Sequence, residues 1–154
     1  MDSKSIKVTE LFITDSKFKK WALLHGIVKV LAESKNTSQN FLRLRNKNTG
    51  LNSEKKVICS LQNEGWVLLF QRGQTEIAEI DLIMQKDEQI RLIEVKTLDS
   101  EWRSFQRISK RQIQKLLLNQ IYFSQFAANT NRPYEFSSWV VWVSDLKIES
   151  IQIN

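Results

Sequence analysis

Residues 79–97 read EIDLIMQKDEQIRLIEVKT, and this stretch decides the fold. Two apolar runs, at about 78–85 and 90–97, flank the polar break Lys86-Asp87-Glu88-Gln89. Runs of this length and composition are typical of strands, and so short a polar connection predicts an antiparallel β-hairpin.

The register of this hairpin brings two acidic residues together. If Gln85 pairs with Ile90, the same register places Asp81 opposite Glu94. Side chains opposed in this way lie roughly 4.5–5.5 Å apart at their β-carbons, and like charges there are destabilising. Because hard cations take oxygen ligands, a divalent metal ion is the natural counter-charge for the two carboxylates.

A lysine belongs to the same group. Side chains alternate along a strand, so Glu94 and Lys96 point to one face and Val95 to the other. Two carboxylates can hold a metal ion that activates water, and an ammonium group can orient that water or stabilise developing negative charge. Together with Asp81, these residue types suit the hydrolysis of a phosphodiester bond.

Length and composition favour one compact domain with an appendage. The chain has 154 residues, is 42% hydrophobic and contains one proline and four glycines, which excludes fibrous and low-complexity classes. Its single cysteine, Cys59, cannot form an internal disulfide. We expect no secretory signal and no membrane-spanning helix, because no apolar run approaches the roughly 18 residues that a span needs. A cytoplasmic location is the expectation.

The net charge of +6 lies in the first third of the chain. Residues 1–50 hold ten Lys or Arg and four Asp or Glu, whereas residues 51–154 hold thirteen of each. A second basic cluster, without any acid from 102 to 115, contains Arg103, Arg107, Lys110, Arg111 and Lys115. Such a stripe beside a carboxylate pair fits a nucleic-acid substrate, although an ordinary solvated helix face has the same composition.

The N-terminal part reads as an extension. Residues 15–34 have the apolar spacing of an amphipathic helix, which could pack on the main domain, mediate a homodimer or larger complex, or lie on an acidic surface. Residues 33–53 are polar and rich in turn formers, which predicts a linker. We therefore divide the chain into a basic extension, 1–49, and a main domain, 50–154.

The main domain predicts an α-β-β-β-α-β order with one further strand. A helix from an N-cap at Ser53 to about Asn63 precedes a strand at 66–70 and a turn at 71–74. After the hairpin, Ser109 and Gln112 have the form of a capping box for a helix that continues to about residue 128. Strands at 139–143 and 147–153 complete a mixed sheet flanked by helices.

These residues resemble the PD-(D/E)XK nuclease superfamily, in which an acid on one hairpin strand precedes Glu/Asp-X-Lys on the next. Here the positions are Asp81 and Glu94-Val95-Lys96, with Ile80 in place of the proline. The chain is more similar still to the YraN-like family of small bacterial predicted endonucleases, through AEIDLI at 78–83 and IEVKTL at 93–98. The resemblance covers about residue 50 to the end and implies a restriction endonuclease-like core.

The resemblance also implies roles for individual residues. Asp81 and Glu94 would be metal ligands for Mg²⁺ or Mn²⁺, joined by the backbone carbonyl of Val95. Lys96 would be the catalytic lysine, and Glu54 a supporting acid from the first helix. The related Holliday junction resolvases share this layout, which adds branched DNA to the candidate substrates.

The expected function is that of a bacterial, metal-dependent deoxyribonuclease, acting as an endonuclease in DNA repair, recombination or mobile-element processing. The alternative is a nucleic-acid-binding or assembly module whose nuclease-like site is inactive. Two departures from the family bear on this choice, Ala78 in place of a glycine and Leu98 in place of an arginine. The basic N-terminal third also suits the binding module.

Overall fold

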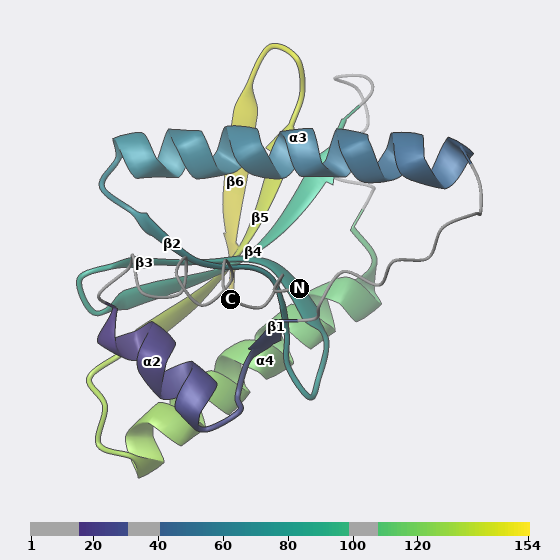
Figure 1. Ribbon diagram of the computed structural model, residues 1–154. Coiled ribbons are helices and arrows are strands. Elements are labelled where there is room, and N and C mark those ends of the chain that lie inside the picture. The colour runs from purple at the N-terminus through teal and green to yellow at the C-terminus, as the bar shows by residue number, and fades with distance from the viewer. Residues whose placement is uncertain (1–15, 31–40, 99–107) are drawn as a thin grey trace, which may run out of the picture.

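The computed structural model describes residues 16–30, 41–98 and 108–154, with the side chains of residues 30 and 41–49 excepted. These residues form one six-stranded sheet, in which the strands lie side by side in chain order, with three helices around it (Figure 1). Neighbouring strands are antiparallel except β4 and β5, which are parallel. The elements are α2 (Lys17–Leu24), β1 (Lys29–Val30), α3 (Phe41–Asn63), β2 (Val67–Gln74), β3 (Glu79–Lys86), β4 (Gln89–Thr97), α4 (Lys110–Asn129), β5 (Glu135–Val143) and β6 (Ile148–Ile153).

Helices cover both faces of the sheet. The long helix α3 lies across one face, while α2 and α4 lie on the other (Figure 1). Two apolar clusters follow from this arrangement, one between the sheet and α3 and one between the sheet and the α2–α4 layer. Leu82, Ile83 and Met84 are completely buried because β3 is covered on both faces. The predicted α/β class and the mixed sheet of a restriction endonuclease-like core are confirmed.

The central hairpin has the predicted register. Gln85 pairs with Ile90, and the ladder between β3 and β4 continues to the pair Leu82–Ile93. One further step would set Asp81 opposite Glu94, but regular pairing ends just before that step. The two acids therefore lie where the strands separate, at the end of the hairpin remote from its turn.

Helix α4 makes the crossover from β4 to the parallel strand β5. It begins with the predicted capping box, in which the Ser109 side chain accepts from the Gln112 N–H and the Gln112 side chain accepts from the Ser109 N–H. This exchange satisfies two donors that a helix start leaves unpaired. The helix is thereby anchored with its first turns beside the open end of the hairpin.

The N-terminal helix is shorter than predicted. The predicted span of 15–34 is wrong because α2 ends at Leu24, and Gly26, with φ of 65°, turns the chain into β1. Phe18 and Trp21 are buried in the core, whereas Leu24 is 82% exposed. Of the three alternatives for this helix, packing on the main domain is therefore present in the structure.

Two other boundaries differ from the prediction. Helix α3 begins at Phe41, so residues 41–52 are helical and Ser53 is not an N-cap; its hydroxyl lies 2.7 Å from that of Thr97. Strand β2 continues to Gln74 through the predicted turn, with an irregular register between Leu68 and Phe70. Local turn propensity is a weak signal that tertiary packing overrides in both cases. Within the described ranges, no helix is both long and apolar enough to span a bilayer.

Candidate metal-binding and catalytic site

The three predicted site residues lie together at the open end of the hairpin. Asp81 is on β3, and Glu94 and Lys96 are on β4. The Val95 N–H donates to Asp81 Oδ2 over 2.8 Å, and Lys96 Nζ donates to Glu94 Oε1 over 2.7 Å. Both side chains of the latter ion pair are mostly buried. Because the strands separate here, the Val95 N–H is available to a side chain and orients the Asp81 carboxylate.

Burial and negative neighbours change the ionisation of Asp81. Desolvation raises its pKa most, and the charge of Glu94 adds to the increase, with a smaller contribution from Glu54. The Val95 N–H and the Lys96 charge act in the opposite direction, and the resulting pKa is about 7. The site therefore holds more negative charge than Lys96 offsets. A bound cation would neutralise this excess negative charge.

Glu54 lies in α3 and is 3% exposed. It accepts from Gln71 Nε2 at 2.7 Å and from Arg72 Nη2 at 3.1 Å, and so ties α3 to β2. Desolvation lowers the pKa of Arg72, but the hydrogen bond and charge of Glu54, together with Glu79 and Asp81, raise it above the usual value. The structure thus brings Glu54 into the electrostatic field of Asp81, with its own charge paired to Arg72.

Sequence reasoning missed Gln71 and Arg72 as members of this cluster. Both stand in the segment that was predicted as a turn, whereas they belong to the end of β2. Arg72 has a φ of 54°, an unusual value for a residue other than glycine. The signal available in the sequence was Glu54, the one acid between residues 41 and 63, because an acid that folding buries needs a cationic partner.

A cleft of about 250 Å³ opens beside the two carboxylates. Asp81 and Glu94 belong to its hairpin side, and α4 forms the opposite side, where Gln112 Nε2 donates to Glu94 Oε1 over 3.4 Å. Gln112 is therefore both a capping residue and a partner of the site. The cleft is lined by Ala78, Glu79, Asp81, Glu94, Gln112, Lys115, Leu116 and Asn119.

The donor set fits a hard cation that keeps part of its water. Across the described ranges, no three side chains of His, Cys, Asp and Glu are grouped closely enough to hold a metal ion. Asp81 and Glu94 each retain one oxygen, Oδ1 and Oε2, that no hydrogen bond among the described residues reaches. Mg²⁺ is typically bound by one or two carboxylates, several waters and substrate phosphates, so a two-carboxylate site suits it. The third predicted ligand, the carbonyl of Val95, stays a prediction.

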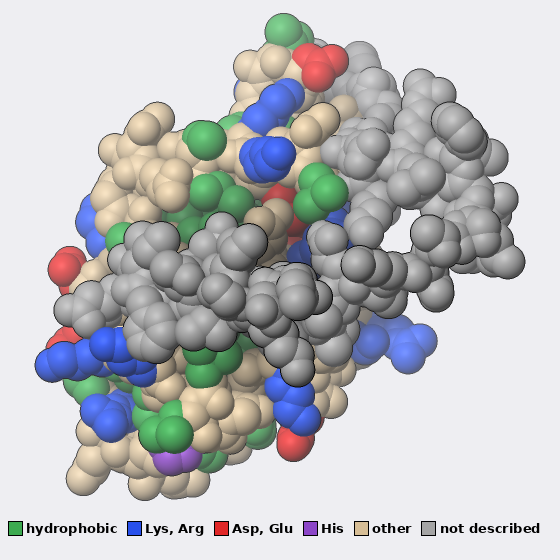
Figure 2. Space-filling view, viewed as in Figure 1, with side chains coloured by type: hydrophobic (Ala, Val, Ile, Leu, Met, Phe, Trp, Pro, Cys, Tyr) green, Lys and Arg blue, Asp and Glu red, His purple; other side chains and the backbone are tan. Residues whose placement is uncertain are grey.

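The basic residues predicted to contact nucleic acid fall in three places. Lys115 lines the cleft, Lys110 and Arg111 are exposed at the start of α4, and Arg103 and Arg107 lie outside the described residues. In Figure 2, the basic side chains of the described residues lie at several separate places on the face that is shown. Among the described members of the basic cluster, only Lys115 lines the cleft beside the carboxylates.

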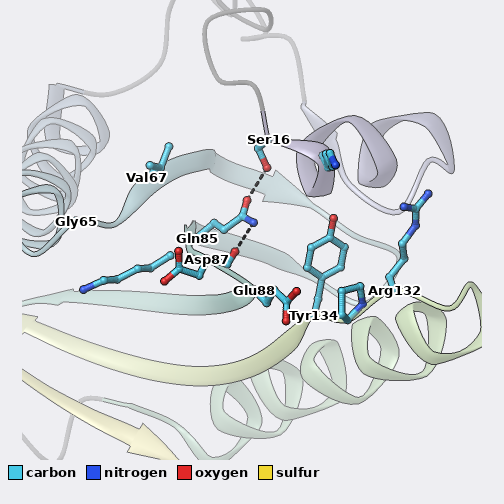
Figure 3. A pocket seen from close by; sticks show the side chains of 11 residues that line it. Ser16, Gly65, Val67, Gln85, Asp87, Glu88, Arg132 and Tyr134 are labelled. Carbon is cyan, nitrogen blue, oxygen red and sulfur yellow. Dashed lines mark hydrogen bonds between the residues drawn. The ribbon is translucent and has the colours of Figure 1, made fainter.

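A larger cavity, of about 920 Å³, lies at the turn end of the hairpin (Figure 3). There the Ser16 hydroxyl donates to Gln85 Oε1, and Gln85 Nε2 donates to the carbonyl of Asp87. Gln85 follows Asp81 by four residues along β3, a separation of roughly 13 Å. Basic and acidic residues both line this cavity, and the carboxylate pair is not among them. We therefore place the candidate site in the smaller cleft.

The six-stranded mixed sheet, its covering helices and the acidic cluster at the open end of the hairpin define an α/β protein with a restriction endonuclease-like core. Residues 53–138, more than half of the chain, match the model of Uncharacterised protein family UPF0102, and the chain belongs to this family. The predicted YraN-like family is thereby confirmed.

Relatives from Campylobacter jejuni support the same assignment. The UPF0102 proteins of strains 81-176, 81116 and RM1221 are each 29% identical to this chain over 68 residues. The matched segment is 44% of this chain and 61% of each relative, so the chain spans about three-fifths of the length of the curated relatives that it matches.

Proposed function

We propose that this protein is a metal-dependent nuclease that hydrolyses phosphodiester bonds of DNA. The observation that carries the proposal is the convergence of Asp81, Glu94 and Lys96, where burial and the charge of Glu94 raise the pKa of Asp81 to about 7. Two carboxylates held together against their own repulsion favour a divalent cation. An endonuclease of the bacterial cytoplasm, acting in repair, recombination or mobile-element processing, is the biological setting that we propose.

Each residue of the site has a role in this proposal. Asp81 and Glu94 would hold the ion, each through the carboxylate oxygen that no hydrogen bond among the described residues reaches, and the Val95 N–H fixes the orientation of Asp81. When bound, Mg²⁺ or Mn²⁺ neutralises charge at the phosphate and makes water more acidic. Lys96 orients the attacking water or stabilises the negative charge that develops on the phosphate oxygens. Lys115, on the opposite side of the cleft, would contact the DNA backbone.

The test is cleavage of linear, branched and single-stranded DNA in the presence of Mg²⁺ or Mn²⁺. We expect Asp81→Asn and Lys96→Met to lower the cleavage rate by at least about a hundredfold, because each removes a group that acts in the transition state. We also expect Mn²⁺ to raise the unfolding temperature of the natural protein and not of Asp81→Asn, since only an ionised pair binds the cation.

Asp87→Asn is the matched control for Asp81→Asn. Asp87 is an exposed acid in the turn of the same hairpin, and its φ of 54° is a conformation that asparagine also adopts readily. The Asp87→Asn variant should cleave DNA at the same rate as the natural protein. Unchanged cleavage in Asp81→Asn would refute the assigned site. Salt-dependent DNA binding without any metal-dependent cleavage would favour the binding module instead.

A further inference from the structure

Asn119 presents a buried donor without a partner beside the candidate site. It lies on α4 and is 1% exposed. The Thr75 hydroxyl donates to its Oδ1 over 2.6 Å, but its Nδ2 has no hydrogen-bond partner within the described part of the chain. Buried polar groups are nearly always paired, because leaving one unpaired costs free energy. An acceptor from a bound molecule would pair the Nδ2 of Asn119.

The position of Asn119 in the cleft indicates where such a molecule would bind. Asn119 lines the same cleft as Asp81 and Glu94, and it follows Lys115 and Leu116 by one turn of α4. Since Asn119 has almost no solvent-exposed surface although it lines an open cleft, it lies at the inner end. A group bound at this end of the cleft would lie next to the Asn119 side chain, whose Nδ2 has to turn toward that group to donate to it.

The chemistry of the inner end suits a neutral acceptor. An amide N–H carries no charge, and the neighbouring cleft residues Ala78 and Leu116 are apolar. A phosphate would pair better with Lys115 and would be repelled by Glu79 near the hairpin. Base carbonyls and ring nitrogens are neutral acceptors on flat, apolar rings, and they match both features.

The size of the cleft limits which bases can enter. Its volume of about 250 Å³ lies below the roughly 300–1,000 Å³ of pockets for drug-sized ligands. A base stacked and paired within a duplex cannot enter such a cleft, whereas an extruded or single-stranded base can. The cleft therefore suits one base at a time.

We propose that Asn119 donates from Nδ2 to an unpaired DNA base bound in this cleft, beside Asp81 and Glu94. The inference rests on the proposed nuclease function and names its substrate class, which is DNA that presents an unpaired nucleotide next to the bond to be cut. Asn119 is thus the group that recognises the base, and Lys115 contacts the backbone.

The test measures DNA binding by fluorescence anisotropy. EDTA is present so that no divalent metal is bound. The probes are a short oligothymidylate and an abasic oligomer of the same length and charge. The natural protein should bind the oligothymidylate more tightly. Asn119→Leu should weaken that binding roughly three- to tenfold and leave the abasic oligomer unaffected, because one hydrogen bond to the base is lost. Lys115→Met should weaken both complexes, because both probes carry phosphates.

A second measurement separates recognition from a structural role. Asn119→Leu should unfold at the same temperature as the natural protein or a higher one, since it removes an unpaired donor and Thr75 can still donate to the carbonyl of Ala78. If the variant instead loses affinity for both oligomers equally, or binds as the natural protein does, the inference is overturned.

Should Asn119→Leu fail to fold, Ala78→Leu is the second variant, because its longer side chain takes up space in the cleft while Asn119 itself is kept. It should abolish the preference for oligothymidylate over the abasic oligomer, and a retained preference overturns the inference. No cleavage is measured in these experiments. Base recognition and the nuclease activity can therefore fail independently of one another.

Discussion

At the level of single residues, the ionisation of Asp81 links the site to the stability of the fold. Burial, followed by the charge of Glu94, raises its pKa from 3.8 to about 7 in the folded protein. Between these values the folded protein keeps a proton that the unfolded chain has released. The free energy of unfolding therefore decreases as the pH rises through this window, and the contribution of Asp81 is constant above it.

The expected result is a difference in pH dependence between the natural protein and Asp81→Asn. From about pH 4 to about pH 7, the natural protein should lose up to a few kcal/mol of stability that the neutral variant keeps. Urea unfolding at pH 5 and pH 8 without divalent metal measures this difference. Asp87→Asn should follow the natural protein. Parallel pH profiles for Asp81→Asn and the natural protein would contradict the raised pKa.

The pair of Glu54 and Arg72 carries a second prediction. Glu54→Ala removes the buried partner of Arg72 and of Gln71. It should lower the free energy of unfolding by about 2–3 kcal/mol. The loss is not larger because the Arg72 guanidinium is partly exposed and can recover some hydration. Glu64→Ala, at an exposed acid just beyond the same helix, is the control and should change stability by less than about 0.5 kcal/mol. Equal effects of the two substitutions would show that the pair adds no stability.

Several residues of the site could be inferred from the sequence, and others could not. Asp81, Glu94 and Lys96 follow from hairpin register and strand alternation, which depend on neighbours close along the chain. Arg72 and Asn119 reach the cluster only because α3 and α4 dock on particular parts of the sheet. That docking depends on packing between distant segments, which has no signature in local spacing.

At the level of elements, the start of α4 is set by its capping box. Ser109→Ala removes the acceptor for the Gln112 N–H and should lower the free energy of unfolding by about 1 kcal/mol. Ser124→Ala, at an exposed position within the same helix, should be neutral or slightly stabilising because alanine has the higher helix propensity. Urea unfolding compares the two. An equal decrease in the free energy of unfolding for Ser124→Ala and Ser109→Ala would show that the loss of the cap is not the cause of the decrease.

The start of helix α3 could not be predicted from local sequence propensity. Its first half contains Asn-Thr-Gly at 48–50, which predicts a break, yet the helix begins at Phe41. Once the turns around Val57 and Leu61 are packed on the sheet, a helix is already nucleated and can extend through weaker residues. The capping box of α4 is the opposite case, because its hydrogen bonds lie within four consecutive residues.

At the level of the whole molecule, α2 completes the main core. Phe18 is completely buried and contacts the rings of Phe123, Tyr134 and Phe136. A segment that reads as an extension therefore supplies part of the hydrophobic layer that α4 and the sheet share. Its unfolding should be coupled to that of the sheet.

Phe18→Ala tests this coupling. The cavity that it leaves should lower the free energy of unfolding by about 3–5 kcal/mol in a single cooperative transition. Leu24→Ala, at a side chain that is 82% exposed on the same helix, should change stability by less than about 0.5 kcal/mol. Calorimetry that finds a separate low-temperature transition for Phe18→Ala, with the main transition unchanged, would show an independent appendage.

The sequence by itself determined the hairpin, its register, the order of the main elements and the juxtaposition of Asp81, Glu94 and Lys96. These depend on periodicity, turn chemistry and hydrogen bonds between residues close in the chain. Only the tertiary structure decided that α2 joins the core, that Glu54 pairs with Arg72, and that a cleft with Asn119 at its inner end opens beside the carboxylates. Those features depend on how separate segments pack together, and packing is a property of the whole sheet with its helices in place.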